Sequence, residues 1–355
     1  MFKSKLFVIA LTLVLAATAF FGASGANAAP GGQISVRISA DKTAFTAGES
    51  ALVNVTVSNT GRRPAKTLKW HTPYDDVEDS LFTVTRDGQP VAYLGAHYKH
   101  AAPTRADYVT LQPGESFTRA VDLGAYYDLS ASGNYSIRYD VSAWNLFSEK
   151  GNAFRTESLA SNKLDLAIEG RPNPAPAAIT PDAVSGSTAF NKCNGSQQSA
   201  LVSARNQASV YAADALAYLT VGTVGPRFSA WFGVYDPGRY TAAKYHFQTI
   251  SEAMDTAPVT FDCSCKKKNV YAYVYANQPY TIYLCNVFWS APLAGTDSKG
   301  GTLIHEMSHF NIVAATNDYA YGQGAAMNLA ITDPNLALDN ADNHEYFAEN
   351  NPAQQ

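Results

Sequence analysis

The chain has 355 residues, 46% of them hydrophobic, and a formal net charge of −4, so it is long enough for two ordinary domains with apolar cores. The slightly acidic balance argues against a nucleic-acid-binding protein, because such a protein usually presents a basic face. Tyrosine is frequent, at 21 residues, and lysine is scarce, which suits a secreted β-rich protein better than a cytosolic one.

The N-terminus has the pattern of a secretory signal peptide. Lys3 and Lys5 precede an apolar run at residues 6–21, and Ala26-Asn27-Ala28 forms a small-residue cleavage site. We therefore expect residues 1–28 to be a signal peptide and the protein to be secreted to the extracellular space. A transmembrane anchor is the alternative, but the run is short for a bilayer and no later stretch is long and apolar enough to cross one.

Short alternating segments fill residues 29–170. Apolar and polar side chains alternate at 34–38, 53–57 and 135–141, and turn signals such as Asp87-Gly88 separate the segments. Strands at this spacing predict an all-β immunoglobulin-like sandwich. No cysteine is available to bridge its sheets, so this domain has to rely on its apolar core.

Two histidines in this region, His97 and His100, lie in a stretch that we expect to be a loop. No carboxylate or cysteine accompanies them at ligand spacing, so solvated loop histidines are favoured over a metal site. No sequence feature gives this region a catalytic role.

Residues 171–188 are rich in proline and small residues and have no periodic apolar pattern. Such a segment is typical of an exposed, extended linker that is open to proteolysis. We expect it to be the activation cleavage region between a propeptide domain at 29–170 and a mature enzyme at 189–355. The alternative is an interdomain linker that stays intact.

The second half begins with an expected helix and a small sheet. Apolar residues share one stripe over residues 196–219, which predicts an amphipathic helix. Residues 231–240 suggest turns and irregular structure, whereas 270–275 and 281–288 are expected to be strands joined by a turn. A strand beside the following motif helix could pair with an extended substrate, although the sequence does not show which strand does so.

The main chemical motif is the His-Glu-x-x-His run from His305 to His309, which we expect on a helix. Two histidines four residues apart lie on one helix face and can bind a single Zn²⁺, and Glu306 can accept a proton from water. A catalytic zinc needs a third protein ligand. The third histidine of the metzincin pattern is absent, which leaves three acidic candidates, Asp318, Glu345 and Glu349, of which Asp318 is nearest in sequence.

Two further features are local. All four cysteines, Cys193, Cys263, Cys265 and Cys285, fall in the second half, where two disulfides are expected in an oxidising compartment, but three pairings are possible. Asp342 and Glu345 are three residues apart, so on a helix both carboxylates would project from one face. They would then favour a bound cation, although two surface acids in a polar tail fit the spacing equally well.

The run from His305 through Thr316-Asn317-Asp318-Tyr319-Ala320-Tyr321-Gly322 resembles the aspzincin metallopeptidases, the deuterolysin and peptidyl-Lys metalloendopeptidase group. The tail at 340–352 is more similar to the peptidyl-Lys branch, and the resemblance covers roughly residues 188–355. It implies an α+β zincin-like domain with one zinc held by His305, His309 and Asp318. It also implies that Glu306 is the general base and that Tyr321 donates its hydroxyl to the oxyanion.

The same resemblance implies disulfides between Cys193 and Cys263 and between Cys265 and Cys285. In the peptidyl-Lys branch, the acids that match Asp342 and Glu345 line the pocket for the residue after the scissile bond, which implies cleavage on the amino side of lysine. His344, between them, is expected to have a structural or supporting role.

These observations predict a secreted zinc metalloendopeptidase, made as a zymogen and acting as a monomer. Its expected partners are protein and peptide substrates with lysine after the scissile bond and its own propeptide, with no nucleic acid and no membrane. One alternative is a deuterolysin-like enzyme of broader specificity, against which Asp342 and Glu345 argue. The other is a secreted binding protein with an inactive zincin domain, against which the intact motif argues.

Overall fold

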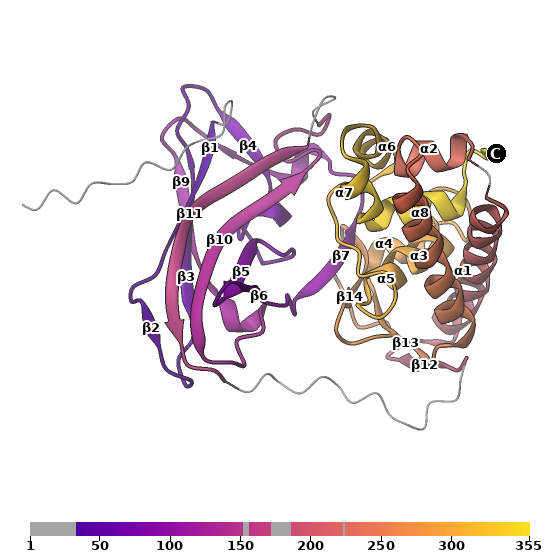
Figure 1. The fold of residues 1–355 in the computed structure, drawn as a ribbon, viewed down its shortest axis with the longest axis horizontal. Helices are drawn as coiled ribbons and strands as arrows, with labels where there is room; N and C mark the ends of the chain where they lie inside the picture. Colours follow the sequence, from indigo (N-terminus) through magenta and orange to yellow (C-terminus); the bar gives the residue numbers. More distant parts are fainter. Residues whose placement is uncertain (1–32, 152–155, 172–185, 223) are drawn as a thin grey trace, which may run out of the picture.

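The computed structural model describes residues 33–151, 156–171, 186–222 and 224–355. A β-rich N-terminal region and a C-terminal domain of helices around a small sheet lie side by side along the long axis of the molecule (Figure 1). The expected signal peptide and most of the expected linker, residues 172–185, lie outside the described residues. None of the described helices combines the length and apolar character that a membrane span requires.

The N-terminal region is built almost entirely from strands. These are β1 (Ile34–Ser39), β2 (Ala44–Phe45), β3 (Leu52–Asn59), β4 (Ala65–Leu68), β5 (Phe82–Arg86), β6 (Gln89–Pro90), β7 (Ala96–His100), β8 (Tyr108–Leu111), β9 (Ser116–Asp122), β10 (Gly133–Ala143) and β11 (Glu157–Ile168), with 3₁₀ helices at Lys69–His71, Arg105–Asp107 and Leu123–Ala125. One sheet has the order β1-β3-β9, a second has the order β2-β11-β10-β5-β6, and β4 pairs with β8.

Alternating side chains build the core of this region. Val53, Val55 and Val57 of β3 are fully buried, and the residues between them are partly exposed. This period of two is what a strand with one buried face requires. Tyr135 and Tyr139 of β10 belong to the same apolar cluster. The alternation predicted from the sequence is therefore confirmed in these strands.

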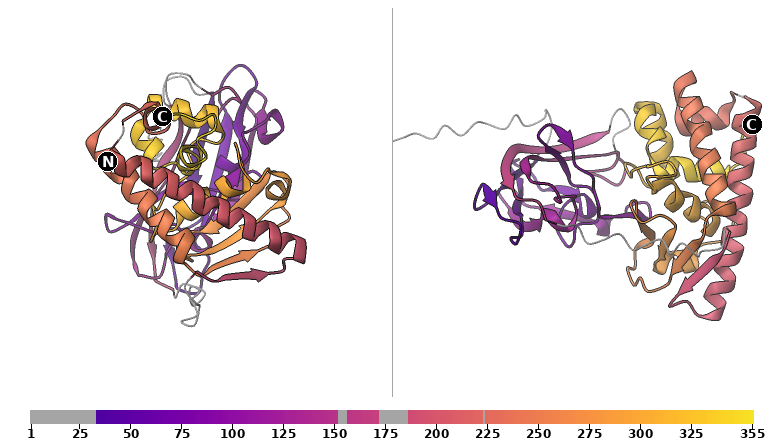
Figure 2. Two further views of the ribbon diagram at one scale, coloured as in Figure 1. Left: turned by 90° about the vertical axis from the view of Figure 1, so that its right-hand side faces the viewer. Right: turned by 60° about the horizontal axis from the view of Figure 1, so that its bottom comes forward.

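The C-terminal domain contains most of the helices. Its elements are β12 (Thr188–Asn191), α1 (Gly195–Val221), α2 (Pro226–Phe232), α3 (Pro237–Thr256), β13 (Val259–Asp262), β14 (Val270–Tyr275), β15 (Thr281–Leu284), α4 (Asn286–Ser290), α5 (Lys299–His309), α6 (Gln323–Thr332), α7 (Pro334–Leu338) and α8 (Ala341–Glu349). The long helix α1 lies on the side of this domain that faces away from the N-terminal region (Figure 2).

Helix α1 confirms the predicted amphipathic helix. It begins at a capping box in which the Asn194 side chain accepts a hydrogen bond from the Gln197 backbone, and it ends at Gly222 in the left-handed conformation, with φ 81°. The Cys193–Cys263 disulfide ties the start of α1 to the end of β13, and Cys265–Cys285 ties the following loop to the end of β15. These are the pairs that the family resemblance implies.

The expectation of irregular structure at residues 231–240 is confirmed only for residues 233–236 and is wrong at both ends of the range. Helix α2 continues to Phe232, and α3 begins at Pro237. The start signal was present in the sequence, because the Asp236 side chain caps the helix by accepting a hydrogen bond from the Arg239 backbone, and proline is well tolerated at the first helical position. The expected strand at 281–288 is also too long, since β15 ends at Leu284 and α4 begins at Asn286.

The sheet of the C-terminal domain includes a strand from the N-terminal region. Its order is β12-β13-β15-β14-β7, so β7 forms the edge and pairs antiparallel with β14 (Figure 1). The expected loop with solvated histidines is therefore wrong, since His97 is 9% exposed and His100 is 1% exposed. His97 and Lys99 are buried because they face the other domain, whereas His100 stacks on Trp70 of its own region with ring centroids 4.1 Å apart. No local pattern in the sequence reveals these contacts.

Candidate metal centre

Helix α5 carries the His-Glu-x-x-His motif through the centre of the C-terminal domain, and its residues Gly300–His309 are all buried. The Ser298 side chain caps the helix by accepting a hydrogen bond from the Gly301 backbone. Glu349 accepts hydrogen bonds from the Ser298 backbone and hydroxyl at 2.8 and 2.7 Å. A Cβ on Gly301 would lie 2.0 Å from a Glu349 oxygen, so glycine is needed there. Glu349 thus anchors the helix start, away from the motif histidines.

Three of the predicted ligands come together at one point. The Nε2 atom of His305 lies 3.4 Å from Asp318 Oδ1, and Nε2 of His309 lies 3.3 Å from Asp318 Oδ2. Both Nε2 atoms and Asp318 Oδ1 are buried, and none has a hydrogen-bond partner among the described residues. Buried polar atoms normally have such partners.

This arrangement fits zinc. Nitrogen and carboxylate ligands that each lie about 2.1 Å from a tetrahedral zinc are about 3.4 Å apart. Two imidazoles and one carboxylate are also a donor set that catalytic zinc uses. The unpartnered atoms of His305, His309 and Asp318 are thus the ones that a bound zinc would satisfy.

Hydrogen bonds on the outer side of each ring fix its tautomer. His305 donates from Nδ1 to Asp342 Oδ1 at 2.8 Å, and His309 donates from Nδ1 to the Thr316 carbonyl at 2.8 Å. Each Nε2 atom is therefore left with its lone pair directed toward the centre, which is the usual arrangement for a metal-binding histidine.

The loop that carries Asp318 is held against the start of α8. The Asn340 side chain accepts hydrogen bonds from the backbones of Tyr319 at 2.7 Å and Ala320 at 3.1 Å, and Asn317 donates its backbone hydrogen to the Asp339 carbonyl at 2.7 Å. Asn340 is not among the residues that the sequence predicts to be functional. An asparagine at a helix N-terminus gives no local sign that it positions a loop of distant residues.

Glu306 is buried beside this centre. Neither of its carboxylate oxygens has a hydrogen-bond partner in the described part of the chain. Burial raises its pKa to about 7, against the opposing charges of His305 and His309. An uncommitted carboxylate of this kind is available to exchange a proton with water or substrate.

The acidic pair on α8 surrounds a buried lysine. Asp342 and Glu345 are fully buried, and between them lies the ammonium group of Lys99 from β7, with Nζ 3.1 Å from Asp342 Oδ1 and also in contact with Glu345 Oε2. Although burial opposes the charge, Asp342 and Glu345 raise the Lys99 pKa well above its usual range. The rings of Tyr271 and Tyr346 form walls, with centroids 5.0 and 5.8 Å from Nζ.

Asp342 has a second role that sequence spacing did not suggest. Besides facing Lys99, it accepts hydrogen bonds from His305 Nδ1 at 2.8 Å and from the Gly322 backbone at 2.7 Å. Burial would raise the Asp342 pKa, but Lys99 and His305 lower it below its usual range. Asp342 therefore connects Lys99 to a predicted metal ligand, and Glu345 Oε2 also lies 3.5 Å from His305 Nδ1.

Tyr321 points at the backbone of β7. Its hydroxyl donates a hydrogen bond to the Tyr98 carbonyl at 3.1 Å, and its ring is buried. The carbonyl that it contacts belongs to the residue immediately before Lys99. The other predicted tail residue, His344, lies away from the centre, with Nδ1 3.1 Å from the Asn340 carbonyl and Nε2 2.9 Å from His246 Nδ1.

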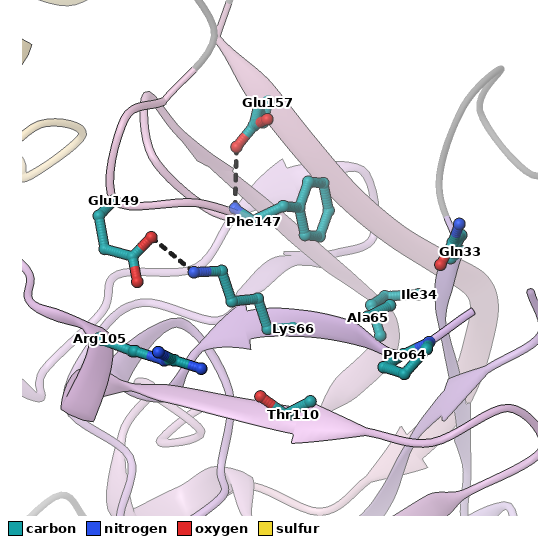
Figure 3. Close-up of a pocket in the computed structure, with 10 residues that line it drawn as sticks. All are labelled: Gln33, Ile34, Pro64, Ala65, Lys66, Arg105, Thr110, Phe147, Glu149 and Glu157. Carbon is teal, nitrogen blue, oxygen red and sulfur yellow. Dashed lines mark hydrogen bonds and ion pairs between the residues drawn. The ribbon is translucent and has the colours of Figure 1, made fainter.

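A cavity of about 800 Å³ lies elsewhere, in the N-terminal region (Figure 3). Lys66, Arg105, Glu149 and Glu157 line it, and Lys66 forms an ion pair with Glu149 at 2.5 Å. None of the motif residues lines this cavity, and we assign no function to it.

Comparisons with known proteins agree with this geometry. The family model for lysine-specific metallo-endopeptidases, the aspzincins, matches residues 217–349. An extracellular protease from Aeromonas hydrophila is 46% identical over 308 residues, which cover 85% of this chain and 88% of that protein. A peptidyl-Lys metalloendopeptidase from Grifola frondosa is 37% identical over 318 residues, with 85% and 88% covered.

Among solved structures, a zinc peptidase from Grifola frondosa matches with 48% identity and a TM-score of 0.45, covering 46% of this chain and all of that chain. The two relatives of known sequence match over both halves of the present chain, and the family model falls on the domain that contains the His305–Asp318 centre. The chain therefore belongs to the aspzincin family of zinc metalloendopeptidases.

Proposed function

We propose that the chain is the zymogen of a secreted endopeptidase that hydrolyses peptide bonds on the amino side of lysine. The observation that carries this proposal is the position of Lys99, whose ammonium group is buried between Asp342 and Glu345 while Tyr321 contacts the preceding carbonyl. A substrate lysine in that pocket would place the bond before it beside Glu306 and the three ligands.

The pocket supports selection of a cation. A buried carboxylate pair without a partner is costly, because both groups lose hydration and repel each other. An ammonium group between Asp342 and Glu345 relieves that cost, as Lys99 does in the uncleaved chain. A neutral side chain would leave the acids unpaired, so it would bind less well.

The chemistry uses side chains with separate tasks. His305, His309 and Asp318 would hold the zinc, which when bound polarises the substrate carbonyl and lowers the pKa of water. Glu306 accepts the proton of the attacking water and delivers it to the departing amine. The Tyr321 hydroxyl donates a hydrogen bond to the carbonyl oxygen as negative charge develops on it.

The zymogen part of the proposal rests on β7. Without this strand, β14 would be the edge of the sheet, and an extended substrate could pair with it as β7 does. We assign residues 29–170 to an immunoglobulin-like propeptide domain, 171–188 to the activation region and 189–355 to the mature enzyme. The N-terminal signal pattern and the name of the Aeromonas relative, an extracellular protease, support secretion.

A digest of a defined protein by the secreted, processed enzyme tests the specificity. We expect mass spectrometry to find products that begin with lysine, and we expect the Glu306→Gln variant to be slower by about 10²- to 10⁴-fold while it keeps its zinc. Cleavage before many residue types would replace this proposal with a broader, deuterolysin-like specificity. An unchanged rate in the variant would remove Glu306 as the base.

A further inference from the structure

His97 lies against the candidate metal centre from the opposite side of the cleft. Its ring stacks on His309, with centroids 4.8 Å apart and an interplanar angle of 27°. One ligand atom each from His97, His309 and Asp318 lie within 4.8 Å of one another. The N-terminal region thus contributes an imidazole to the surroundings of the three predicted ligands.

The ring of His97 is not committed to another contact through its nitrogens. Its side chain is 9% exposed, its ring contacts in the described residues are with Tyr93 and His309, and no hydrogen bond there involves its nitrogens. The nearest side chains that could bind a metal ion together with a His97 nitrogen are His309 and Asp318.

The register of β7 is fixed by its neighbours, which explains why His97 lies there. Side chains two apart on a strand project from the same face. Lys99 is anchored by Asp342 and Glu345, and the Tyr98 carbonyl is held by Tyr321. His97 pairs with Val274 in the same ladder, so anchoring Lys99 in the pocket places His97 on the side of the metal centre.

We propose that His97 is a fourth protein ligand of the zinc in the uncleaved chain, which fills the coordination position that the attacking water needs. This inference rests on the proposed function, because it requires a zinc at His305, His309 and Asp318. Zinc sites with four protein ligands are structural, and catalytic sites keep one position open. A zinc with four protein ligands would have no position for the attacking water. The bond between Tyr98 and Lys99 would therefore remain intact although it lies in a substrate-like position.

Activation then has two requirements. Cutting the chain near residues 171–188 frees the N-terminal region covalently, but β7 also has to leave the sheet so that His97 releases the metal. A chain cut in the linker that keeps β7 in place would remain without an open coordination position.

The test is zinc K-edge X-ray absorption on the full chain with Glu306→Gln, which prevents self-hydrolysis. We expect the scattering to fit three imidazoles in this chain and two when His97→Gln is added. Tyr98→Phe, one residue further along β7, is the matched control and should keep three. All three proteins should contain about one zinc per chain.

Two imidazoles in the Glu306→Gln chain itself would overturn the role of His97, and this result requires no variant of His97 to fold. A chain without stoichiometric zinc would instead overturn the proposed function, so the two failures are distinguishable. Three imidazoles that persist in the His97→Gln chain would also overturn the proposal, because another histidine would then be the ligand.

Discussion

Replacing Lys99 by methionine should release the N-terminal region from the cleft. Methionine is close to lysine in length but leaves Asp342 and Glu345 buried without the ammonium group that lies between them. Removing one partner of a buried ion pair typically costs about 3 to 5 kcal/mol. We use the lower value of this range, about 3 kcal/mol, because Asp342 keeps its hydrogen bonds from His305 and Gly322.

A loss of about 3 kcal/mol in docking corresponds to roughly a hundredfold larger population of the open form. The assay is the initial rate of hydrolysis of a fluorogenic lysine peptide by the uncleaved chain, with chain integrity verified by mass spectrometry. We expect the Lys99→Met chain to be about a hundredfold more active than the parent before any processing.

The matched control is Lys163→Met. Lys163 lies on β11 of the same region and pairs with Asp165, but its side chain is 63% exposed, so its removal should not change the rate. If the uncleaved Lys99→Met chain is as inactive as the parent, the buried ion pair does not hold β7 in place. The proposal that Lys99 occupies the site of a substrate lysine would then lose its support.

Four further outcomes follow from contacts at the site. Tyr321→Phe in the processed enzyme should lower kcat/KM by about 10²- to 10³-fold with zinc content unchanged, because it removes a donor to the developing oxyanion. Asp342→Asn should weaken zinc binding by about 10- to 100-fold in a chelator competition, because the acceptor for His305 Nδ1 becomes poorer. Glu345→Gln should reduce the preference for lysine in a peptide-library digest and weaken zinc binding less than Asp342→Asn does, because Glu345 Oε2 lies 3.5 Å from His305 Nδ1 and Asp342 Oδ1 lies 2.8 Å from it; equal losses of zinc affinity in the two variants would contradict this ranking. Burial raises the pKa of Glu349 to about 9 from 4.5, so between these pH values the folded state holds a proton that the unfolded state has lost. The free energy of unfolding should therefore fall as pH rises from about 4.5 to about 9. In a series of denaturant titrations over this pH range, Glu349→Gln should flatten the decrease.

The parts of the fold that could be predicted from the sequence are those whose signals are local. The alternation in β3 and β10 and the apolar stripe of α1 are confirmed, because a strand or helix that packs on its own domain shows its period directly. The histidine pair of α5 belongs to the same class, since its spacing alone places both rings on one helix face.

The parts that could not be predicted depend on contacts between distant residues. Strand β7 has no apolar alternation, because Ala96, His97, Lys99 and His100 are all buried, and its strand partner β14 lies more than 150 residues later in the chain. A strand with polar residues on both faces shows no hydrophobic period, and its pairing with a distant strand leaves no local signal in the sequence. Asn340 was missed for a related reason, since its role is to hold the Asp318 loop through backbone groups.

The contacts of Asp342 connect the buried Lys99 to the candidate metal centre. It faces the ammonium group in the pocket and also fixes the ring of His305, so its ionised form serves both tasks. Burial alone would favour the protonated form, and Lys99 is the largest single influence that opposes it. The N-terminal region therefore supplies the cation that lets Asp342 stay ionised in a dry interior. Under the proposed function, a substrate lysine would restore the same charge to the same place once the N-terminal region has left.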